Sequence, residues 1–355
     1  MDLTELADRV IAGGRITRDE ALAVLRLPDA ATVPLVAEAG RVRRAFHGDA
    51  VKLDYIVNLK SGKCPEDCIY CPQRLGSDAD ILRYSWLSHD EAVELAARGV
   101  AAGARSVCLV SSGNGPSNRD VERVGAIACS VKERHPSVEV AVCIGILKPG
   151  QAERLAEFGV DAYNHNYNTS ASHYPDVCTT HTHADRVRTV QMVREAGLSI
   201  DAGLLAGMGQ RDEQLVEVAF ELLDAGASAV PVNFLMAFDG TPLAHHNELT
   251  AQQCLRILAM IRLVHGKADV RVAAGREQHL GWMQPLALEV GNAIYFGDYA
   301  TGSGQEGSED LRMIAEAGLS IYGSDHRETP GVPVVHIRDL SLIHISEPTR
   351  LLSIS

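Results

Sequence analysis

A repeated alternation of short β-rich runs and amphipathic helices, beginning at Val51, constrains this chain more than any other feature. Each helix pattern ends at a glycine, and apolar residues after it start the next run. The hexapeptide Glu-Ala-Gly-Leu-Ser-Ile occurs from Glu195 and again from Glu316. Because glycine in the left-handed conformation is a common helix C-cap, this punctuation indicates βαβ units around a parallel sheet.

The pattern predicts eight strands. They fall at residues 51–59, 106–111, 138–144, 160–165, 198–204, 228–234, 270–274 and 293–296. Eight strand and helix pairs favour an α/β fold of the (β/α)8 TIM-barrel type, with an open doubly wound sheet as the alternative.

The segments outside the alternation differ in character. Residues 1–50 read as short helices, with a capping box at Thr17 and Glu20 before a helix that we expect to run from Ala21 to Leu27. We therefore predict a helical N-terminal cap over residues 1–50, a barrel over 51–322 and a tail over 323–355. From about Ser341 the tail resembles translated adapter sequence more than the end of a domain.

The chain is acidic, with 33 Lys and Arg against 46 Asp and Glu and a net charge of −13. This balance argues against binding to nucleic acid or to an anionic membrane, both of which need clustered basic side chains. The sequence has no apolar run long enough to span a bilayer and no signal peptide. We therefore expect a cytoplasmic protein whose eight cysteines are thiols or metal ligands, not disulfides.

Barrels of this type carry their chemistry at the C-terminal ends of the strands. The polar residues follow this rule: some come directly after the first predicted strand, and others lie on or end later strands. They are Cys64, Cys68 and Cys71 after the first strand, then Cys108, Asn164, Asn166, Asp201, Asn233 and Arg271.

The strongest chemical signal is the run Cys64-Pro-Glu-Asp-Cys68-Ile-Tyr-Cys71. Three thiolates on one short loop can bind three irons of a [4Fe-4S] cubane and leave the fourth iron open to a small molecule. A closed zinc site is the alternative. It needs four ligands, and the sequence has no second Cys or His pair at the required spacing.

This spacing, with Tyr70 before the third cysteine, resembles the radical S-adenosylmethionine superfamily. Further stretches resemble the biotin synthase family within it, in the same order along the chain from Val51 to about Ile321. These stretches are Asp161-Ala-Tyr-Asn164-His165-Asn166, Ser228-Ala-Val-Pro-Val-Asn233, Gly240-Thr-Pro-Leu243 and Val270-Arg271-Val-Ala-Ala-Gly275-Arg-Glu-Gln278.

The resemblance implies roles for several residues. Cys64, Cys68 and Cys71 would hold the [4Fe-4S] cluster, which binds S-adenosylmethionine through its open iron. Tyr70 would lie against the adenine, with Asn166 and Asn168 toward the ribose and the substrate. Asn164 and Asn233 would contact the ureido ring of dethiobiotin, because paired amides suit its N–H donors and its carbonyl.

The family also implies a [2Fe-2S] cluster deep in the barrel, held by three cysteines and one arginine. Cys108 and Arg271 match, but the other two ligand positions fall at Ala141 and Asp201. Cys143 shares a face of its strand with Ala141, about 6 to 7 Å away, so a tentative set is Cys108, Cys143, Asp201 and Arg271.

An ion pair between Asp201 and Arg271 is the alternative, and it would explain both residues without a second cluster. In that case Cys108 and Cys143 would be small buried hydrophobes. Cys129, Cys178 and Cys254 have no motif around them, and we expect them to be structural.

These observations support three hypotheses. The first is a biotin synthase-type enzyme that inserts sulfur into dethiobiotin, with a flavodoxin or ferredoxin as electron donor and a homodimer as the implied assembly. The second is a paralogous radical enzyme that lacks the sulfur-donor cluster and acts on another small molecule. The third is an iron-sulfur sensor of redox state or iron.

Overall fold

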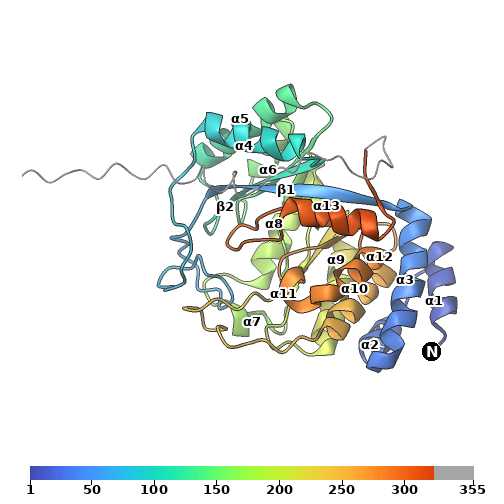
Figure 1. Cartoon of the computed structure of the whole chain (residues 1–355). Helices are drawn as coiled ribbons and strands as arrows, with labels where there is room; N and C mark the ends of the chain where they lie inside the picture. The colour runs from blue at the N-terminus through green and yellow to red at the C-terminus, as the bar shows by residue number, and fades with distance from the viewer. Residues whose placement is uncertain (324–355) are drawn as a thin grey trace, which may run out of the picture.

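The computed structural model describes residues 1–323, so the tail expected from about Ser341 lies outside the described residues. A closed barrel of parallel strands forms its centre (Figure 1). The first strand, β1 (Ala50–Lys60), pairs with β2 (Ser106–Ser111) on one side and with β9 (Ala293–Tyr295) on the other. This closure confirms the predicted (β/α)8 barrel and excludes the open sheet. The remaining barrel strands are β3 (Glu139–Cys143), β4 (Ala162–Asn164), β5 (Ser199–Asp201), β6 (Leu204–Ala206), β7 (Ala229–Phe234) and β8 (Asp269–Val272).

The fifth barrel strand is split into β5 and β6 around Gly203, where the sequence predicts one continuous run. β5 pairs with β4, and β6 pairs with β7. A Cβ atom at Gly203 would lie 1.9 Å from the carbonyl oxygen of Pro231 on β7. Only glycine allows the two backbones to approach so closely.

Amphipathic helices surround the barrel in Figure 1, and sequence-encoded caps start several of them. Capping boxes begin four of these helices, with Ser88, Ser117, Thr182 and Thr250 as the N-cap residues. The helices between the strands are α4 (His89–Ala101), α5 (Asn118–Arg134), α6 (Gln151–Glu157), α7 (Tyr174–Val177), α8 (His183–Glu195), α9 (Asp212–Ala225), α10 (Ala251–His265), α11 (Arg276–Leu280) and α12 (Gln284–Val290).

Three helices precede β1: α1 (Leu3–Ile11), α2 (Arg18–Leu25) and α3 (Thr32–His47). The capping box of Thr17 and Glu20 is present at the start of α2, which ends at Leu25 and not at the predicted Leu27. α3 packs against α10 and α12 on the outside of the barrel.

The second copy of the repeated hexapeptide ends in β10 (Ser320–Ile321), after α13 (Gly307–Glu316). β10 pairs only with the start of β1, through Ala50 and Val51, and lies outside the closed ring of barrel strands. The first copy leads into β5, a barrel strand. The same local sequence therefore ends a helix in both places, but tertiary pairing decides whether the next run joins the barrel.

Alternation along β1 separates the barrel interior from the helical layer. Leu53, Val57 and Leu59 are buried in the large apolar core with residues of the surrounding helices. Asp54 points inward, where its carboxylate meets Arg271 of β8. The barrel interior therefore contains a charged pair, Asp54 and Arg271, whereas the layer between the strands and the helices is apolar.

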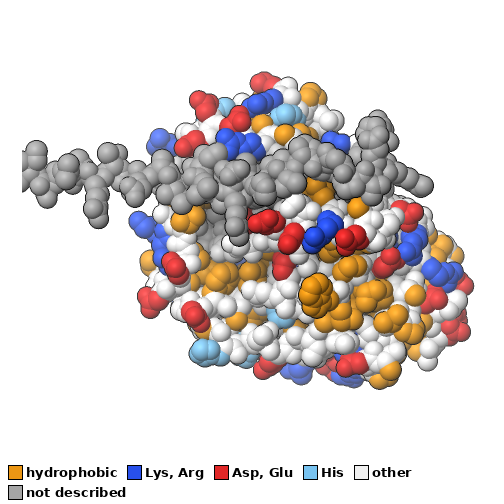
Figure 2. All heavy atoms as spheres, viewed as in Figure 1, with side chains coloured by type: hydrophobic (Ala, Val, Ile, Leu, Met, Phe, Trp, Pro, Cys, Tyr) orange, Lys and Arg blue, Asp and Glu red, His pale blue; other side chains and the backbone are white. Residues whose placement is uncertain are grey.

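Among residues 1–323 no helix is long and apolar enough to cross a membrane. On the face shown in Figure 2, acidic and basic side chains are interspersed over the visible described surface.

Candidate active site

The cysteine loop follows β1 and is held by its own backbone. The Cys64 N–H donates to the carbonyl of Gln73 at 3.0 Å, and the Leu75 N–H donates to the carbonyl of Cys64 at 2.6 Å. The side-chain oxygen of Gln73 accepts from the Gly62 N–H at 2.9 Å. These bonds close the loop and fix it at the C-terminal end of β1.

The three thiols of the loop are free, and Cys64 and Cys68 are buried while Cys71 is half-buried. Burial raises the pKa of Cys64 and raises the pKa of Cys71 to about 11. The thiols therefore hold their protons until a metal displaces them. Three cysteines on one fixed loop, none of them in a disulfide, match the three protein ligands of a [4Fe-4S] cubane.

A fourth cysteine lies against this loop. The Sγ of Cys178, which follows α7, lies 3.6 Å from the Sγ of Cys68. The hydrogen bond from the Cys68 thiol, the main cause, lowers the pKa of Cys178 to about 6 and raises the pKa of Cys68. The sequence places the two cysteines 110 residues apart, so the expectation that Cys178 is merely structural missed this contact.

Two acidic residues inside the motif fasten the loop to the segment after α7. Asp67 accepts from the Thr179 N–H at 2.9 Å, and Glu66 accepts from the Thr180 hydroxyl at 2.5 Å. Glu66 also contacts His181 and accepts from the Asn114 amide at 2.6 Å. Burial opposes ionisation of Glu66, but these donors together lower its pKa. The Pro-Glu-Asp spacer therefore has a structural role besides spacing the cysteines.

The residues predicted to face the nucleoside meet around the split strand. The Asn168 amide donates to the Tyr70 hydroxyl at 2.7 Å, which joins the end of the cysteine loop to the segment after β4. Asn168 adopts φ +66, a left-handed conformation that asparagine tolerates. The side chain of Asn166 accepts from the Gly203 N–H at 2.8 Å. The structure thus brings Tyr70, Asn166 and Asn168 to one side of the β5–β6 break.

The two amides predicted to face the substrate stand on β4 and β7. The Asn164 amide donates to the Tyr295 hydroxyl at 2.9 Å. The Asn233 amide donates to the Leu204 carbonyl at 3.1 Å, and its oxygen accepts from the Ala274 N–H at 3.3 Å. An asparagine has two donor hydrogens and two acceptor lone pairs. The Asn233 amide therefore keeps one donor hydrogen and one acceptor lone pair for a ligand.

Deeper in the barrel, Arg271 lies between two carboxylates. Its Nε donates to Asp54 at 2.5 Å and its Nη1 donates to Asp201 at 2.8 Å. The guanidinium also stacks on the Tyr295 ring, 4.9 Å from the centroid. Burial raises the pKa of Asp54 and raises the pKa of Asp201 to about 6, although Arg271 opposes both shifts. The Asp201–Arg271 ion pair expected as the alternative is present, with Asp54 as an additional partner.

Beside this triad, Cys108 is buried in a small apolar cluster with Ala141 and Ala162, and Cys143 packs against it. Burial raises the pKa of both Cys108 and Cys143. A [2Fe-2S] cluster of the family type requires three cysteines and a free arginine. The site offers two cysteines and an arginine occupied by two carboxylates, so these residues do not fit that cluster.

Asp54 is the member of the triad that sequence reasoning missed. Its signal was available: period-two alternation on β1 places Asp54 on the inward face. β1 and β8 both pair with β9, which stands between them. An acidic residue on the inward face two strands from Arg271 was therefore a candidate partner.

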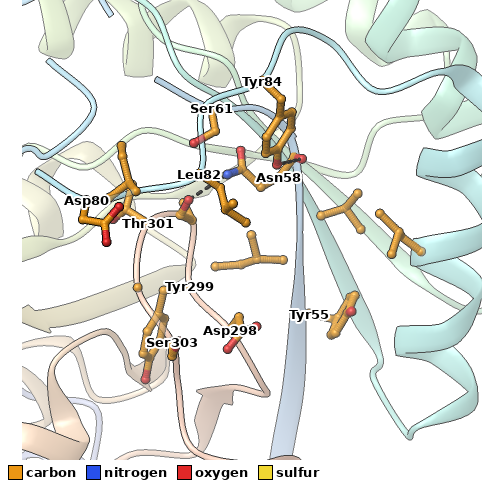
Figure 3. Close-up of a pocket in the computed structure, with 16 residues that line it drawn as sticks. Tyr55, Asn58, Ser61, Asp80, Leu82, Tyr84, Asp298, Tyr299, Thr301 and Ser303 are labelled. Atoms are coloured by element: carbon orange, nitrogen blue, oxygen red, sulfur yellow. Dashed lines mark hydrogen bonds between the residues drawn. The ribbon is translucent and has the colours of Figure 1, made fainter. Parts of the chain in front are cut away.

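A cavity of about 280 Å³ opens beside the C-terminal half of β1. Figure 3 shows Ser61 and Tyr84 at one end of it and Asp298, Tyr299 and Ser303 at the other. The Asn58 amide donates to the Ala300 carbonyl at 2.7 Å. None of the residues predicted from the sequence to form the active site lines this cavity.

Family models match most of the described chain. The Radical SAM superfamily model matches residues 59–222, from the end of β1 to α9. The model of the Biotin and Thiamin Synthesis associated domain matches residues 231–320, from β7 to β10.

Curated relatives are similar over nearly the whole chain. The chain is 55% identical to Biotin synthase 2 of Frankia casuarinae over 321 residues, which cover 90% of this chain and 89% of the relative. It is 56% identical to Biotin synthase of Streptomyces avermitilis over 314 residues, covering 88% and 81% respectively.

Solved structures share the fold at low identity. Methylornithine synthase superposes with a TM-score of 0.77 at 19% identity, covering 89% of this chain and 97% of that one. The FeFe-hydrogenase maturase HydG from Carboxydothermus hydrogenoformans gives a TM-score of 0.75 at 19% identity, covering 89% and 78%.

Proposed function

The chain belongs to the biotin synthase family of radical S-adenosylmethionine enzymes, and we propose that it converts dethiobiotin into biotin by inserting sulfur. The observation that carries the proposal is one juxtaposition. A fixed loop with three free thiols meets, through Tyr70 and Asn168, a set of amides on and after β4 and on β7. The proposal takes residues 51–322 as the catalytic barrel and residues 1–50 as its cap.

The cysteine loop is proposed to hold the [4Fe-4S] cluster through Cys64, Cys68 and Cys71. When bound, that cluster supplies the electron that splits S-adenosylmethionine into methionine and a 5'-deoxyadenosyl radical. The chain contributes a site that shields the thiols, since Cys64 and Cys68 are each less than 10% exposed. Such burial keeps water and oxygen from reactive species.

Tyr70, Asn166 and Asn168 are proposed to bind the nucleoside part of S-adenosylmethionine. The Asn168–Tyr70 hydrogen bond fixes the tyrosine ring at the end of the cysteine loop. Asn166 is oriented by Gly203 at the strand break. An amide held in this way can still donate to one ribose hydroxyl and accept from another.

Asn164 and Asn233 are proposed to bind the ureido ring of the substrate. The remaining donor hydrogen of Asn233 suits the ureido carbonyl, and its remaining lone pair suits a ureido N–H. Both amides are already oriented by protein partners. Binding therefore needs little reordering of these side chains.

The proposal also includes a flavodoxin or ferredoxin as electron donor, a homodimer and a cytoplasmic location. The eight free cysteines of the chain support a reducing compartment. No step is assigned to a [2Fe-2S] cluster, because Cys108, Cys143, Asp201 and Arg271 do not fit one. The inserted sulfur is therefore proposed to come from a separate sulfide donor.

One observation favours a second candidate function. The Asp54–Arg271–Asp201 triad fills the position of the family's sulfur-donor cluster. A paralogous radical enzyme that abstracts hydrogen from another small molecule would need no such donor.

Anaerobic reconstitution of the full chain separates the two candidates. The protein is given S-adenosylmethionine, a flavodoxin reducing system, sulfide and dethiobiotin, and biotin and 5'-deoxyadenosine are measured by mass spectrometry. Biotin formation, and growth of a biotin auxotroph lacking its own synthase on dethiobiotin, support the first proposal. Formation of 5'-deoxyadenosine without biotin, in protein that holds its [4Fe-4S] cluster, would replace it with the second.

A further inference from the structure

Three buried side chains place metal-ligand atoms around one point beside the cysteine loop. They are Cys68, Cys178 and His181, whose ligand atoms all lie within 4.8 Å of one another. The two sulfurs are 3.6 Å apart, and Cys178 Sγ is 3.2 Å from His181 Nδ1. Within residues 1–323 no other set of three His, Cys or acidic side chains converges this closely.

These separations match a tetrahedral zinc site. Zinc binds thiolate sulfur at about 2.3 Å and imidazole nitrogen at about 2.0 Å. A tetrahedron with these bond lengths places two sulfurs about 3.8 Å apart and a sulfur about 3.5 Å from a nitrogen. The observed distances of 3.6 and 3.2 Å are close to these values, so a zinc ion needs only small side-chain movements to enter.

Neighbouring groups complete the coordination. Glu66 contacts His181 Nδ1, and Asp67 Oδ1 lies 3.2 Å from Cys178 Sγ, so either carboxylate can supply a fourth ligand. His181 Nε2 lies 2.8 Å from the Tyr174 hydroxyl and 3.1 Å from Nη2 of Arg186. When zinc occupies Nδ1, the Tyr174 hydroxyl is the partner that can accept the remaining ring N–H, because Arg186 only donates.

We propose that the cluster-free chain binds one zinc ion through Cys68, Cys178 and His181, with a carboxylate of Glu66 or Asp67 as the fourth ligand. Both sulfurs bind as thiolates, each thiol proton still present is released to solvent, and nothing is oxidised or reduced. Because Cys68 is also a proposed cubane ligand, the zinc-bound and cluster-bound states exclude each other. Zinc then protects the empty site, and cubane assembly requires its release. This inference goes beyond the proposed reaction.

The test is a metal titration of the full chain, freed of cluster and metal and kept under reductant. Bound Zn²⁺ is measured by competition with a chromogenic chelator. Co²⁺ in the same site reports thiolate ligation through its charge-transfer absorption. We expect one zinc per chain in the wild type, and Cys178→Ser and His181→Gln each to weaken zinc binding by more than about 100-fold, beyond the usual effect of losing an outer-shell partner.

Two control variants locate the site. Cys254→Ser alters another buried cysteine, on α10, and Cys71→Ser alters the cubane triplet without touching the proposed zinc ligands. Both are expected to bind zinc as the wild type does. Equal zinc binding by Cys178→Ser and the wild type, or loss of zinc in Cys71→Ser, would overturn the proposal. Circular dichroism identifies a variant that fails to fold, and His181→Gln then carries the test in place of Cys178→Ser.

A second measurement follows cubane assembly by visible absorption, with and without equimolar zinc. Zinc is expected to slow assembly in the wild type and to have little effect on Cys178→Ser. An equal effect on both would also overturn the proposal. Neither measurement involves turnover, so failure of the zinc proposal is distinguishable from failure to make biotin.

Discussion

The buried triad makes a prediction about the pH dependence of stability. Arg271 meets two carboxylates, so the triad carries one more negative charge than its guanidinium balances. Burial raises the pKa of Asp201 from 3.8 to about 6. Since the folded state then holds this proton more tightly than the unfolded chain, folding is favoured at low pH. That stability is lost as the pH rises from 3.8 through 6.

The magnitude follows from the shift. A difference of about two pKa units corresponds to about 3 kcal/mol between fully protonated and fully ionised Asp201. Roughly half of this is already lost at pH 5, so about 1.5 kcal/mol of unfolding free energy remains to be lost between pH 5 and pH 8. Asp201→Asn removes this pH-dependent loss of unfolding free energy, because the titrating carboxyl is gone and Asp54 alone then pairs with Arg271.

The assay is urea unfolding of the full chain at pH 5 and at pH 8, for the wild type, Asp201→Asn and the exposed control Asp224→Asn. We expect the unfolding free energy of Asp201→Asn to gain about 1.5 kcal/mol relative to the wild type between the two pH values. Asp224→Asn should follow the wild type. Arg271→Met, which strands both carboxylates, should lose about 3 to 5 kcal/mol at pH 8. Parallel curves for Asp201→Asn and the wild type would refute the assignment of the shifted proton to this triad.

Three further predictions concern the proposed site. Alanine at Cys64, Cys68 or Cys71 should abolish 5'-deoxyadenosine formation, and near-normal cleavage in any of these variants, measured by chromatography, would contradict the cluster assignment. Asn233→Ala should weaken dethiobiotin binding by about 1 to 3 kcal/mol but leave S-adenosylmethionine binding unchanged in calorimetry; equal losses would show that its role is different. Gly203→Ala should reduce the unfolding free energy by at least about 2 kcal/mol, because its Cβ would overlap a carbonyl of β7; unchanged urea unfolding would rule out that clash.

The barrel could be predicted because its signals are local. The predicted run at 106–111 coincides with β2, and 51–59 lies within β1. The break at Gly203 could not be predicted, because it depends on the close approach of the β7 backbone, and a local sequence pattern does not report such a contact. The second hexapeptide forms β10 at the edge of β1 for the same reason.

The candidate site also has a part that local sequence predicts and a part that only the fold reveals. The cysteine loop is contiguous in sequence, and its spacing alone indicates a cubane. Cys178 and His181 lie more than 100 residues from the loop, and only the path of the chain after β4 brings them beside Cys68. Contacts of this kind have no sequence motif, and so the proposed zinc site was not found before the fold was known.

The triad shows how changes on separate strands depend on one another. A buried arginine must face an anion, because an unpaired guanidinium inside a barrel costs several kcal/mol. A family-type cluster would supply that anion; here Asp54 on β1 and Asp201 on β5 supply it instead. Replacing Asp201 alone with cysteine would leave Arg271 paired with Asp54, and Ala141 would still lack a thiol. The cluster position therefore cannot be restored by one substitution: the ligands on two strands and the partner on a third have to change together.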